Sequence, residues 1–459
     1  MKKIKKEREL LVVYFNEFNY LFLKKNAQKY KCSEILKLLK KKKIATTTQD
    51  KIQGKNLDPW VHHVSINTGQ PSKIHKVYTW SKNIPLKKKQ IWDLLAKKGI
   101  KSYAWCPMNA KYIANKNLNL FFPDPWNFSN KIYPYRLRTL GLLPRYYAQN
   151  YTDPKIYKII GYILSAIYGL VINNYILKLI KDVPNFLFLL LWKGWKNYLL
   201  FLFLDYISII ILKKELQKNK SSFVFLFLNS IAHFQHNNWD SKEKDKKFFF
   251  KFINKICKEL NHVDKSFKSS LIFNGFEQKQ IKNQYLLRPK NPSEFLKTFG
   301  ITFTKVEQNM TNGGLIFFKN KSDRILSEKI LRNFCIGNYF FFSIKKMDEK
   351  TLFYRIQVRS SKNFNHQINS NKEINKHLFY DLGKNYYNNI DRKSLMKKNK
   401  KFSKFTNDLI NNLYFIKSTG IHNNKGTLFY KNVLIDKKII INNEIENHEI
   451  YNIIKKHFI

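Results

Sequence analysis

The stretch LLVVYFNEFN, residues 10 to 19, decides the fold class. Its first six residues, from Leu10 to Phe15, are apolar throughout and favour β-structure, which predicts a strand buried on both faces. Asn16 and Glu17 follow directly, at the carboxyl end of this predicted strand. Ligands of doubly wound α/β sheets bind at the carboxyl ends of strands, so Asn16 and Glu17 are candidate site residues.

Elements of the same kind recur along the chain. Phe223–Leu228 is a second fully apolar strand, and Leu271–Phe273 predicts a third. Lys87–Lys98 has apolar residues at helical spacing and leads, through a glycine, into a predicted strand at Ile100–Trp105. This alternation of helices and strands predicts an α/β protein.

Composition narrows the class of protein further. The 459 residues are 44% hydrophobic, which is enough to bury a sizeable core and excludes a disordered chain. The formal net charge of +52 favours anionic partners. Lysines are spread along the whole sequence without forming one basic domain, so nucleic-acid binding is a weaker hypothesis than a general attraction for anions.

The stretch from Ile159 to Leu212 is the most apolar part of the sequence, but charged residues and a proline interrupt it. It lacks the clean apolar run of about 20 residues that a membrane helix needs, so we predict buried or amphipathic helices and leave peripheral membrane contact open. The N-terminal apolar run is short and has no small-residue cleavage site, and the four cysteines lie far apart. We therefore expect a cytoplasmic protein without a disulfide framework.

The segment after the second predicted strand carries the strongest local pattern. It reads Asn229-Ser-Ile-Ala-His233-Phe-Gln-His236. If this segment is a helix, Asn229 and His233 are spaced by four residues and face the same side, as metal ligands often do. The alternative for each histidine is a side chain satisfied by packing or by the surrounding loop.

Five short motifs occur in a fixed order over nearly the whole chain. They are Phe15-Asn16-Glu17-Phe18-Asn19, Pro59-Trp60-Val61 leading to Thr68-Gly69 and His75, Ile91-Trp92-Asp93-Leu94-Leu95 leading to Gly99, Asn229 to His233, His236 and Trp239, and Gly420-Ile421-His422 leading to Gly426. In this order they resemble the alkaline-phosphatase-like superfamily, in its type I phosphodiesterase/nucleotide pyrophosphatase branch. More narrowly, they resemble uncharacterised bacterial members, some of which are encoded near surface-glycan genes.

The resemblance implies one alkaline-phosphatase-like domain over residues 1–459. This domain would be a three-layer sandwich with a central mixed, mostly parallel sheet. Two insertions are expected, a helical one at about 145–220 and an irregular, cap-like one at about 280–410. Polar stretches within the second, at Lys362–Lys376 and Lys397–Lys404, read as loops.

Active members of the superfamily hold two metal ions, and the resemblance matches Asn229, His233 and His422 to the Asp and two His that hold one of them. The other site departs from the pattern. Asn16 stands where a strand-one Asp is expected, and Asn274-Gly275 stands where an Asp-His pair is expected.

The Thr or Ser nucleophile of the family is also missing. Its position falls near Pro59, and the nearest hydroxyl belongs to Ser65. An Asn ligand contributes no charge, so two adjacent cations would not be balanced. We therefore expect one divalent ion, zinc or manganese.

The candidate side chains fall into two groups. The metal candidates are Asn16, Glu17, Asn229, His233 and His422. The candidates for general acid or base are His62, His63 and His236, for which packing or helix-surface positions are the alternative.

The leading hypothesis is a metal-dependent phosphoesterase, phosphodiesterase-like hydrolase or phosphotransferase. Its substrate would be an anionic phosphate ester, glycan-linked or nucleotide-linked. A catalytically degenerate binding protein on the same fold is the second hypothesis, and a basic nucleic-acid-binding protein is the third. The sequence leaves the oligomeric state open.

Overall fold

The computed structural model describes residues 8–50, 57–78, 86, 88–127, 131–150, 154–175, 179, 182, 184–186, 188, 197–308, 312–336, 339–356 and 412–459. These residues form two compact units. Unit 1 comprises Met1–Ala148, Ile156–Gln280 and Thr419–Ile459, and unit 2 comprises Gln149–Lys155 and Ile281–Ser418. The predicted polar loops at Lys362–Lys376 and Lys397–Lys404 lie outside the described residues.

Unit 1 is built on an 8-stranded sheet. In order across the sheet, its strands are β16 (Glu444–Glu446), β2 (Lys42–Thr47), β15 (Lys425–Lys431), β6 (Phe267–Phe273), β1 (Arg8–Phe15), β5 (Phe223–Leu228), β3 (Ser102–Trp105) and β4 (Leu118–Phe122). Neighbouring strands pair in parallel, except that β15 runs antiparallel to both β6 and β2. The predicted α/β fold with a central mixed, mostly parallel sheet is confirmed.

Strand β1 lies inside this sheet, between β5 and β6, and its residues from Leu10 to Tyr14 are fully buried. Its side chains alternate between the two faces, because successive residues of a strand point in opposite directions. Leu11, Val13 and Phe15 join the large core cluster on one face. On the other face, Tyr14 stacks on His63 of helix α3 (Pro59–Thr68). Burial on both faces explains why the strand is apolar throughout.

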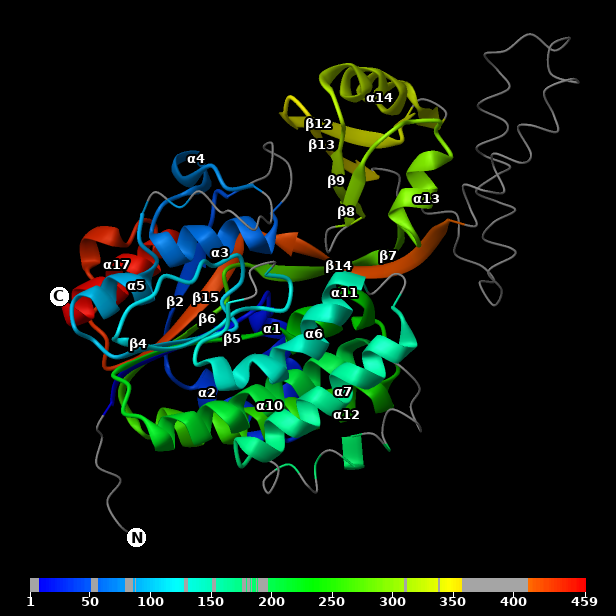
Figure 1. Ribbon diagram of the computed structural model, residues 1–459. Coiled ribbons are helices and arrows are strands. Elements are labelled where there is room, and N and C mark those ends of the chain that lie inside the picture. The colour runs from blue at the N-terminus through cyan, green and yellow to red at the C-terminus, as the bar shows by residue number, and fades with distance from the viewer. Residues whose placement is uncertain are drawn as a thin grey trace, which may run out of the picture. The chain divides into compact units, whose positions relative to one another are not determined.

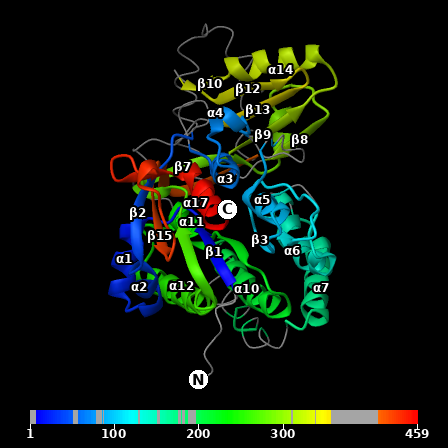
Figure 2. The same ribbon diagram turned by 90° about the vertical axis from the view of Figure 1, so that its left-hand side faces the viewer.

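Helices lie on both faces of the sheet (Figures 1 and 2). The helices of unit 1 are α1 (Tyr20–Lys29), α2 (Ser33–Leu39), α3 (Pro59–Thr68), α4 (Ser72–His75), α5 (Ile91–Lys97), α6 (Arg138–Asn150), α7 (Ile156–Ile172), α10 (Asn197–Lys218), α11 (Ser230–Asn238), α12 (Glu243–Asp264) and α17 (Ile450–Phe458), with short 3-10 turns at Tyr135–Leu137, Lys437–Ile439 and Asn447–Glu449. Helices α1, α2, α10 and α12 contribute to the large core cluster with β1, whereas α3 and α5 pack on the opposite face through His63 and Trp92. The unit is therefore a three-layer sandwich.

Apolar residues at helical spacing predict helix over Tyr20–Lys43, and the structure divides this segment. It forms α1, α2 and the first residues of β2. Lys31 adopts a positive φ of 53° between the two helices, which turns the chain. Leu23 of α1 and Ile35 of α2 are both buried in the large core cluster.

Unit 2 contains regular structure where irregular structure was expected. Its 4-stranded antiparallel sheet has the order β12 (Phe342–Asp348), β13 (Thr351–Ile356), β9 (Gly313–Phe317) and β8 (Lys305–Gln308). Helices α13 (Pro292–Lys297) and α14 (Lys321–Asn333) and the short strands β10 (Cys335–Ile336) and β11 (Tyr339–Phe340) belong to it. Its own core includes Leu296, Ile316 and Leu352. The chain enters unit 2 within β7 (Glu277–Pro289) and returns within β14 (Leu413–Asn423).

The division into one domain with two insertions stays a prediction. Helices α6, α7 and α10 do fill much of the segment at about 145–220. Within the described part of the chain, no helix combines the length and the apolar character that crossing a bilayer requires.

Candidate metal site at the end of strand β1

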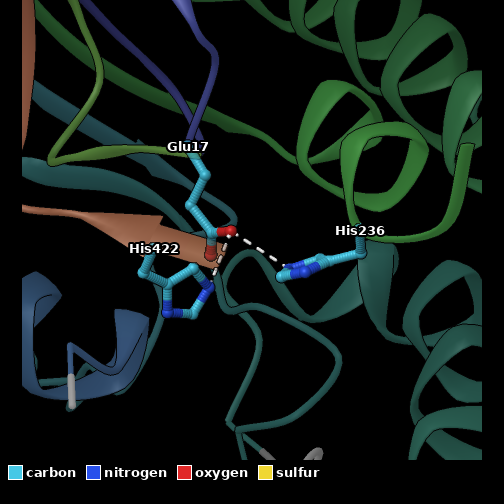
Figure 3. Close-up of side chains that lie close together, drawn as sticks. All are labelled: Glu17, His236 and His422. Atoms are coloured by element: carbon cyan, nitrogen blue, oxygen red, sulfur yellow. Dashed lines mark ion pairs between the residues drawn. The ribbon is translucent and has the colours of Figure 1, made fainter. Parts of the chain in front are cut away.

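Three side chains from distant parts of unit 1 converge just beyond β1 (Figure 3). Glu17 follows β1, His236 lies on α11, and His422 lies near the end of β14. Glu17 Oε2 is 3.0 Å from His236 Nε2 and 3.1 Å from His422 Nε2. The ligand atoms of all three residues lie within 4.8 Å of one another. Among the residues that the structure describes, this is the only such group of three His, Cys, Asp or Glu side chains.

The backbone at Glu17 directs its carboxylate into this cluster. The residue has a positive φ of 53°, which a non-glycine residue adopts only when its surroundings impose it. Two hydrogen bonds fix the turn: Asn16 N donates to Leu228 O at 2.8 Å, and Gln278 N donates to Glu17 O at 3.2 Å. The sharp turn leaves the Glu17 side chain 1% exposed.

Amide groups hold the Glu17 carboxylate on both oxygens. Gln278 Nε2 donates to Oε2 at 2.6 Å, and Asn16 Nδ2 donates to Oε1 at 3.1 Å. Asn16 Nδ2 also donates to Asn229 Oδ1 at 2.8 Å. Fixed amide donors orient a carboxylate without competing for its charge, so the carboxylate remains available to a cation.

The start of α11 is held by a second carboxylate. Asp205 of α10 accepts hydrogen bonds from the backbone N–H groups of Asn229 and Ser230, at distances of 2.8 to 3.1 Å. A carboxylate at a helix N-terminus satisfies free donors and complements the helix dipole. Burial raises the pKa of Asp205 to about 6, although these hydrogen bonds oppose the shift. Asp205 thereby fixes the helix that presents His236.

Burial by itself would raise the pKa of Glu17, but the charges of His422 and His236 outweigh it and hold that pKa well below its usual value. Burial would lower the pKa of His422, yet the neighbouring Glu17 carboxylate raises it to about 9. Without a metal ion, therefore, Glu17 is ionised and His422 is protonated at neutral pH. Asp58, at the start of α3, adds to the negative field at His422.

The two ring nitrogens of His422 have different surroundings. Nδ1 lies 2.6 Å from the carbonyl oxygen of Leu57, which fixes the proton on Nδ1. Nε2 is buried and faces Glu17 Oε2, with which it forms an ion pair. A histidine held through one nitrogen, with the other directed at a carboxylate, is the usual arrangement of a metal-ligating imidazole.

The structure brings together five of the eight predicted site residues. Asn16, Glu17 and Asn229 form one hydrogen-bonded chain, and His236 and His422 contact its Glu17 end. His422 belongs to the long strand β14, just before the turn into β15.

His233 lies beside this cluster without joining it. Its ring stacks on Phe201 of α10, with ring centroids 3.3 Å apart and an interplanar angle of 7°. The centroid of its ring is 6.4 Å from that of His236. Within the described residues it is His236, three positions further along α11, that meets Glu17.

His62 and His63 occupy the interior of α3. Both are fully buried. His62 Nδ1 lies 3.2 Å from Thr48 Oγ1 and 3.3 Å from Asp50 Oδ2. His63 stacks on Tyr14, and burial lowers its pKa well below the usual value, so it is neutral. The role of these residues as acid or base stays a prediction.

Two residues of the site had not been singled out from the sequence. Gln278 lies four residues after Asn274, and its amide binds Glu17 across the sheet end, a contact that no sequence spacing indicates. Asp205 is a single acidic residue within an otherwise apolar stretch, which is the one feature of the sequence that sets it apart. Its partner Asn229 lies on another element, so the sequence offers no spacing that links them.

No protein-family model matches the sequence, and no curated protein matches it either. Solved structures do match. Human ectonucleotide pyrophosphatase/phosphodiesterase 5 is 9% identical with a TM-score of 0.43, over 98% of this chain and 94% of that one. Phosphonoacetate hydrolase from Sinorhizobium meliloti is 10% identical with a TM-score of 0.41, over 98% and 95%.

The TAB5 alkaline phosphatase is 8% identical with a TM-score of 0.35, over 98% of this chain and 97% of that one.

Proposed function

We propose that this protein is a metal-dependent hydrolase of phosphate esters that uses one divalent cation held by Glu17, His236 and His422. One observation carries the proposal: a carboxylate and two imidazoles, from three separate elements, direct their ligand atoms to one point. Two His and one Glu form a known catalytic zinc set, in which a fourth position stays open for water or substrate.

The residues present fit such an ion. In a tetrahedral zinc site, neighbouring ligand atoms are about 3.4 Å apart. The separations of 3.0 and 3.1 Å from Glu17 Oε2 to the two imidazole nitrogens are close to this. A cation at the Nε2 of His422 would displace its proton and take its place beside the Glu17 carboxylate. The bond from Nδ1 to Leu57 O already selects the required tautomer.

A second ion finds no support among the described residues. Asn274 lies where the family places an acidic ligand, but its amide is already occupied. Its Nδ2 donates to Phe18 O at 2.6 Å, and its Oδ1 accepts from Thr427 N at 2.6 Å. Breaking two buried hydrogen bonds to bind a cation through a neutral amide would be unfavourable. A single ion, zinc or manganese, is therefore the cofactor we propose.

A bound divalent cation would supply Lewis acidity and lower the pKa of a coordinated water. The chain's own residues would position the reaction. Gln278 and Asn16 fix the Glu17 carboxylate, and Asp205 fixes α11. Besides Glu17, the carboxylate of Asp58 also acts electrostatically on His422. We therefore propose Asp58 as a candidate general base.

A protein nucleophile is not part of the proposal. Pro59 occupies the first position of α3, where the family places a hydroxyl. Ser65 lies six residues further on, fully buried, with its Oγ 3.0 Å from His75 Nε2. Val77 N donates to His75 Nδ1, so Nε2 carries the proton and His75 cannot act as a base toward Ser65. Direct attack by water is the mechanism that fits these residues.

The substrate class we propose is an anionic phosphate ester, glycan-linked or nucleotide-linked. The sequence resemblance and the net charge of +52 support this choice, since a basic surface raises the local concentration of anions. A cytoplasmic location belongs to the same proposal.

One observation favours a second candidate, a binding protein without turnover. In the metal-free state, Glu17 is already ion-paired to His236 and His422, which satisfies the charge inside the cluster. A cluster that is balanced in this way can persist as a structural element on an inherited enzyme fold.

Metal titration and a turnover assay distinguish the two candidates. The chelator-treated full chain is titrated with zinc and with manganese in a calorimeter, then assayed against bis(p-nitrophenyl) phosphate and a nucleotide-sugar. We expect one equivalent of metal and metal-dependent release of product. Binding of one equivalent without turnover of either ester would favour the binding protein. Absence of metal binding would overturn the proposed site.

Two variants locate the ion. Glu17→Gln keeps the size of the side chain but removes its charge, and it should lower metal affinity by more than the 10–100-fold typical of supporting residues. His262→Ala is the matched control, because His262 is an exposed histidine on α12 away from the cluster. Equal metal affinity in the two variants would contradict the assignment.

A further inference from the structure

Helix α7 (Ile156–Ile172) exposes apolar side chains over most of its length. Its sequence, IYKIIGYILSAIYGLVI, contains one charged residue, Lys158. Nine large apolar or aromatic side chains are 41% to 68% exposed, and we call them the α7 apolar face: Ile156, Tyr157, Ile160, Ile163, Leu164, Ile167, Tyr168, Val171 and Ile172. Single exposed apolar residues are common on protein surfaces, but a continuous face of this kind marks an interaction site.

The opposite side of α7 packs against helix α6, which lies beside it (Figure 1). Gly169 is buried, and a Cβ atom there would lie 2.2 Å from Thr139 Oγ1, so α6 and α7 approach closely at this point. Tyr162 contacts Tyr146 of α6, with ring centroids 5.1 Å apart. A surface helix normally directs its apolar side to the core. Helix α7 packs through a narrow side and leaves its wider apolar side facing outward.

Charge indicates what covers this face. From 131 to 175 the sequence contains six basic residues, Lys131, Arg136, Arg138, Arg145, Lys155 and Lys158, and one acidic residue, Asp153. Lys158 lies at the first turn of α7. Arg136 donates to Asn173 Oδ1 at 2.8 Å, just beyond the last turn, but its charge is paired with Glu215. The exposed basic side chains of Lys155 and Lys158 therefore mark the N-terminal end of the apolar face.

We propose that the α7 apolar face docks on the surface of an anionic lipid bilayer. A 17-residue helix is about 25 Å long and would lie in the plane of the interface, with its apolar side chains among the acyl chains. Tyr157 and Tyr168 have an apolar ring and a polar hydroxyl, which suits this boundary. A second copy of the chain is a poorer occupant, because each copy has a net charge of +52 and the two would repel.

Vesicle co-sedimentation of the full chain tests the proposal. Vesicles of phosphatidylcholine alone are compared with vesicles that contain phosphatidylglycerol. The variant Ile160→Glu/Leu164→Glu/Ile167→Glu places three charges on the α7 apolar face without touching the core. We expect the wild type to bind the anionic vesicles and the variant to bind at least roughly a hundredfold more weakly.

The matched control is Leu434→Glu/Ile441→Glu, since these side chains are 92% and 68% exposed elsewhere on unit 1. This control should bind vesicles as the wild type does. If the α7 variant binds as strongly as the control, general basic charge alone explains the binding and the proposal is overturned. If the wild type binds neither kind of vesicle, the proposal is overturned as well.

A second pair of measurements separates lipid from a second copy. Lys158→Gln with Arg138→Gln should weaken binding to anionic vesicles by roughly fivefold for each charge removed, because each basic residue near an anionic surface contributes about this factor. Sedimentation velocity without lipid should show a monomer for the wild type. A wild-type dimer that the α7 variant abolishes would assign the face to self-association and overturn the lipid proposal.

Discussion

Two pairs of histidines in this protein differ in their burial and in the groups that their rings contact. His62 and His63 lie side by side in α3, fully buried. His236 and His422 come from different elements and are partly exposed, with 34% and 21% of their side chains accessible. The first pair lies in a helix packed against the sheet, whereas the second lies beyond the carboxyl end of β1 and is partly accessible to solvent.

Their partners differ as well. His63 packs between the aromatic rings of Tyr14 and Phe227, and neither of its ring nitrogens has a hydrogen bond. His236 and His422 share one carboxylate oxygen of Glu17. An imidazole that contacts rings acts as a flat packing group, and one that contacts an ionised carboxylate can hold a charge or a metal ion. Partners thus decide function where residue type alone does not.

The largest expected effect concerns pH. The pKa of His422 is raised to about 9 from 6.5, so its contribution to stability is complete below about pH 6.5 and disappears as the pH rises through about 9. Denaturant unfolding of the metal-free protein between pH 6.5 and 9 should show a loss of up to roughly 3 kcal/mol in the free energy of unfolding. The pKa of Glu17 is lowered, so its own contribution disappears only as the pH falls into the acid range.

The control for this measurement is His422→Gln, which should unfold with little pH dependence over the same range. His262→Ala should keep the slope of the wild type. If the free energy of unfolding of His422→Gln depends on pH as steeply as that of the wild type, another group titrates. His422 would then not be the charged member of its pair, as the comparison requires.

The next effect concerns the amide that supports Glu17. Gln278→Leu removes the 2.6 Å hydrogen bond to Glu17 Oε2 while keeping the charge of the cluster. We expect metal affinity to fall by about 10–100-fold, because groups that orient a metal ligand typically have this effect. Calorimetric titration measures it, and Gln49→Leu is the matched control, since Gln49 is exposed and contacts Glu446. Equal affinities would mean that Glu17 is oriented without Gln278.

The smallest effect concerns the buried pair. His63→Phe should raise the free energy of unfolding by about 1–2 kcal/mol, because it removes two buried nitrogens without hydrogen bonds and keeps a flat ring against Tyr14. Metal affinity should not change. Thermal or urea unfolding measures the stability. A clear destabilisation or a loss of metal binding would show that His63 has a polar role.

Much of the fold could be predicted from local patterns. The apolar run Phe223–Leu228 is the whole of β5, and the run Leu10–Phe15 ends where β1 ends, because strands buried on both faces must be apolar throughout. The helical segment predicted at Tyr20–Lys43 forms two helices, because Lys31 adopts a positive φ between them and no glycine signals the turn.

The candidate site could be predicted only in part. Asn16, Glu17 and Asn229 follow strands that neighbour one another in the sheet, and their proximity follows from the parallel pairing of β1 with β5. The choice between His233 and His236 could not be predicted. Both lie on the short helix α11, and only the direction of that helix relative to β14 brings one of them to Glu17.

The sequence by itself determined the α/β class, the buried strand β1 and the polar residues at its carboxyl end, because each of these depends on neighbours along the chain. Only the tertiary structure decided that His236 and His422 share Glu17, that β15 runs antiparallel between β6 and β2, and that the apolar side of α7 faces outward. These features depend on contacts between residues far apart in sequence. The side-chain periodicity of a single element shows that a face exists but does not show what the face will meet.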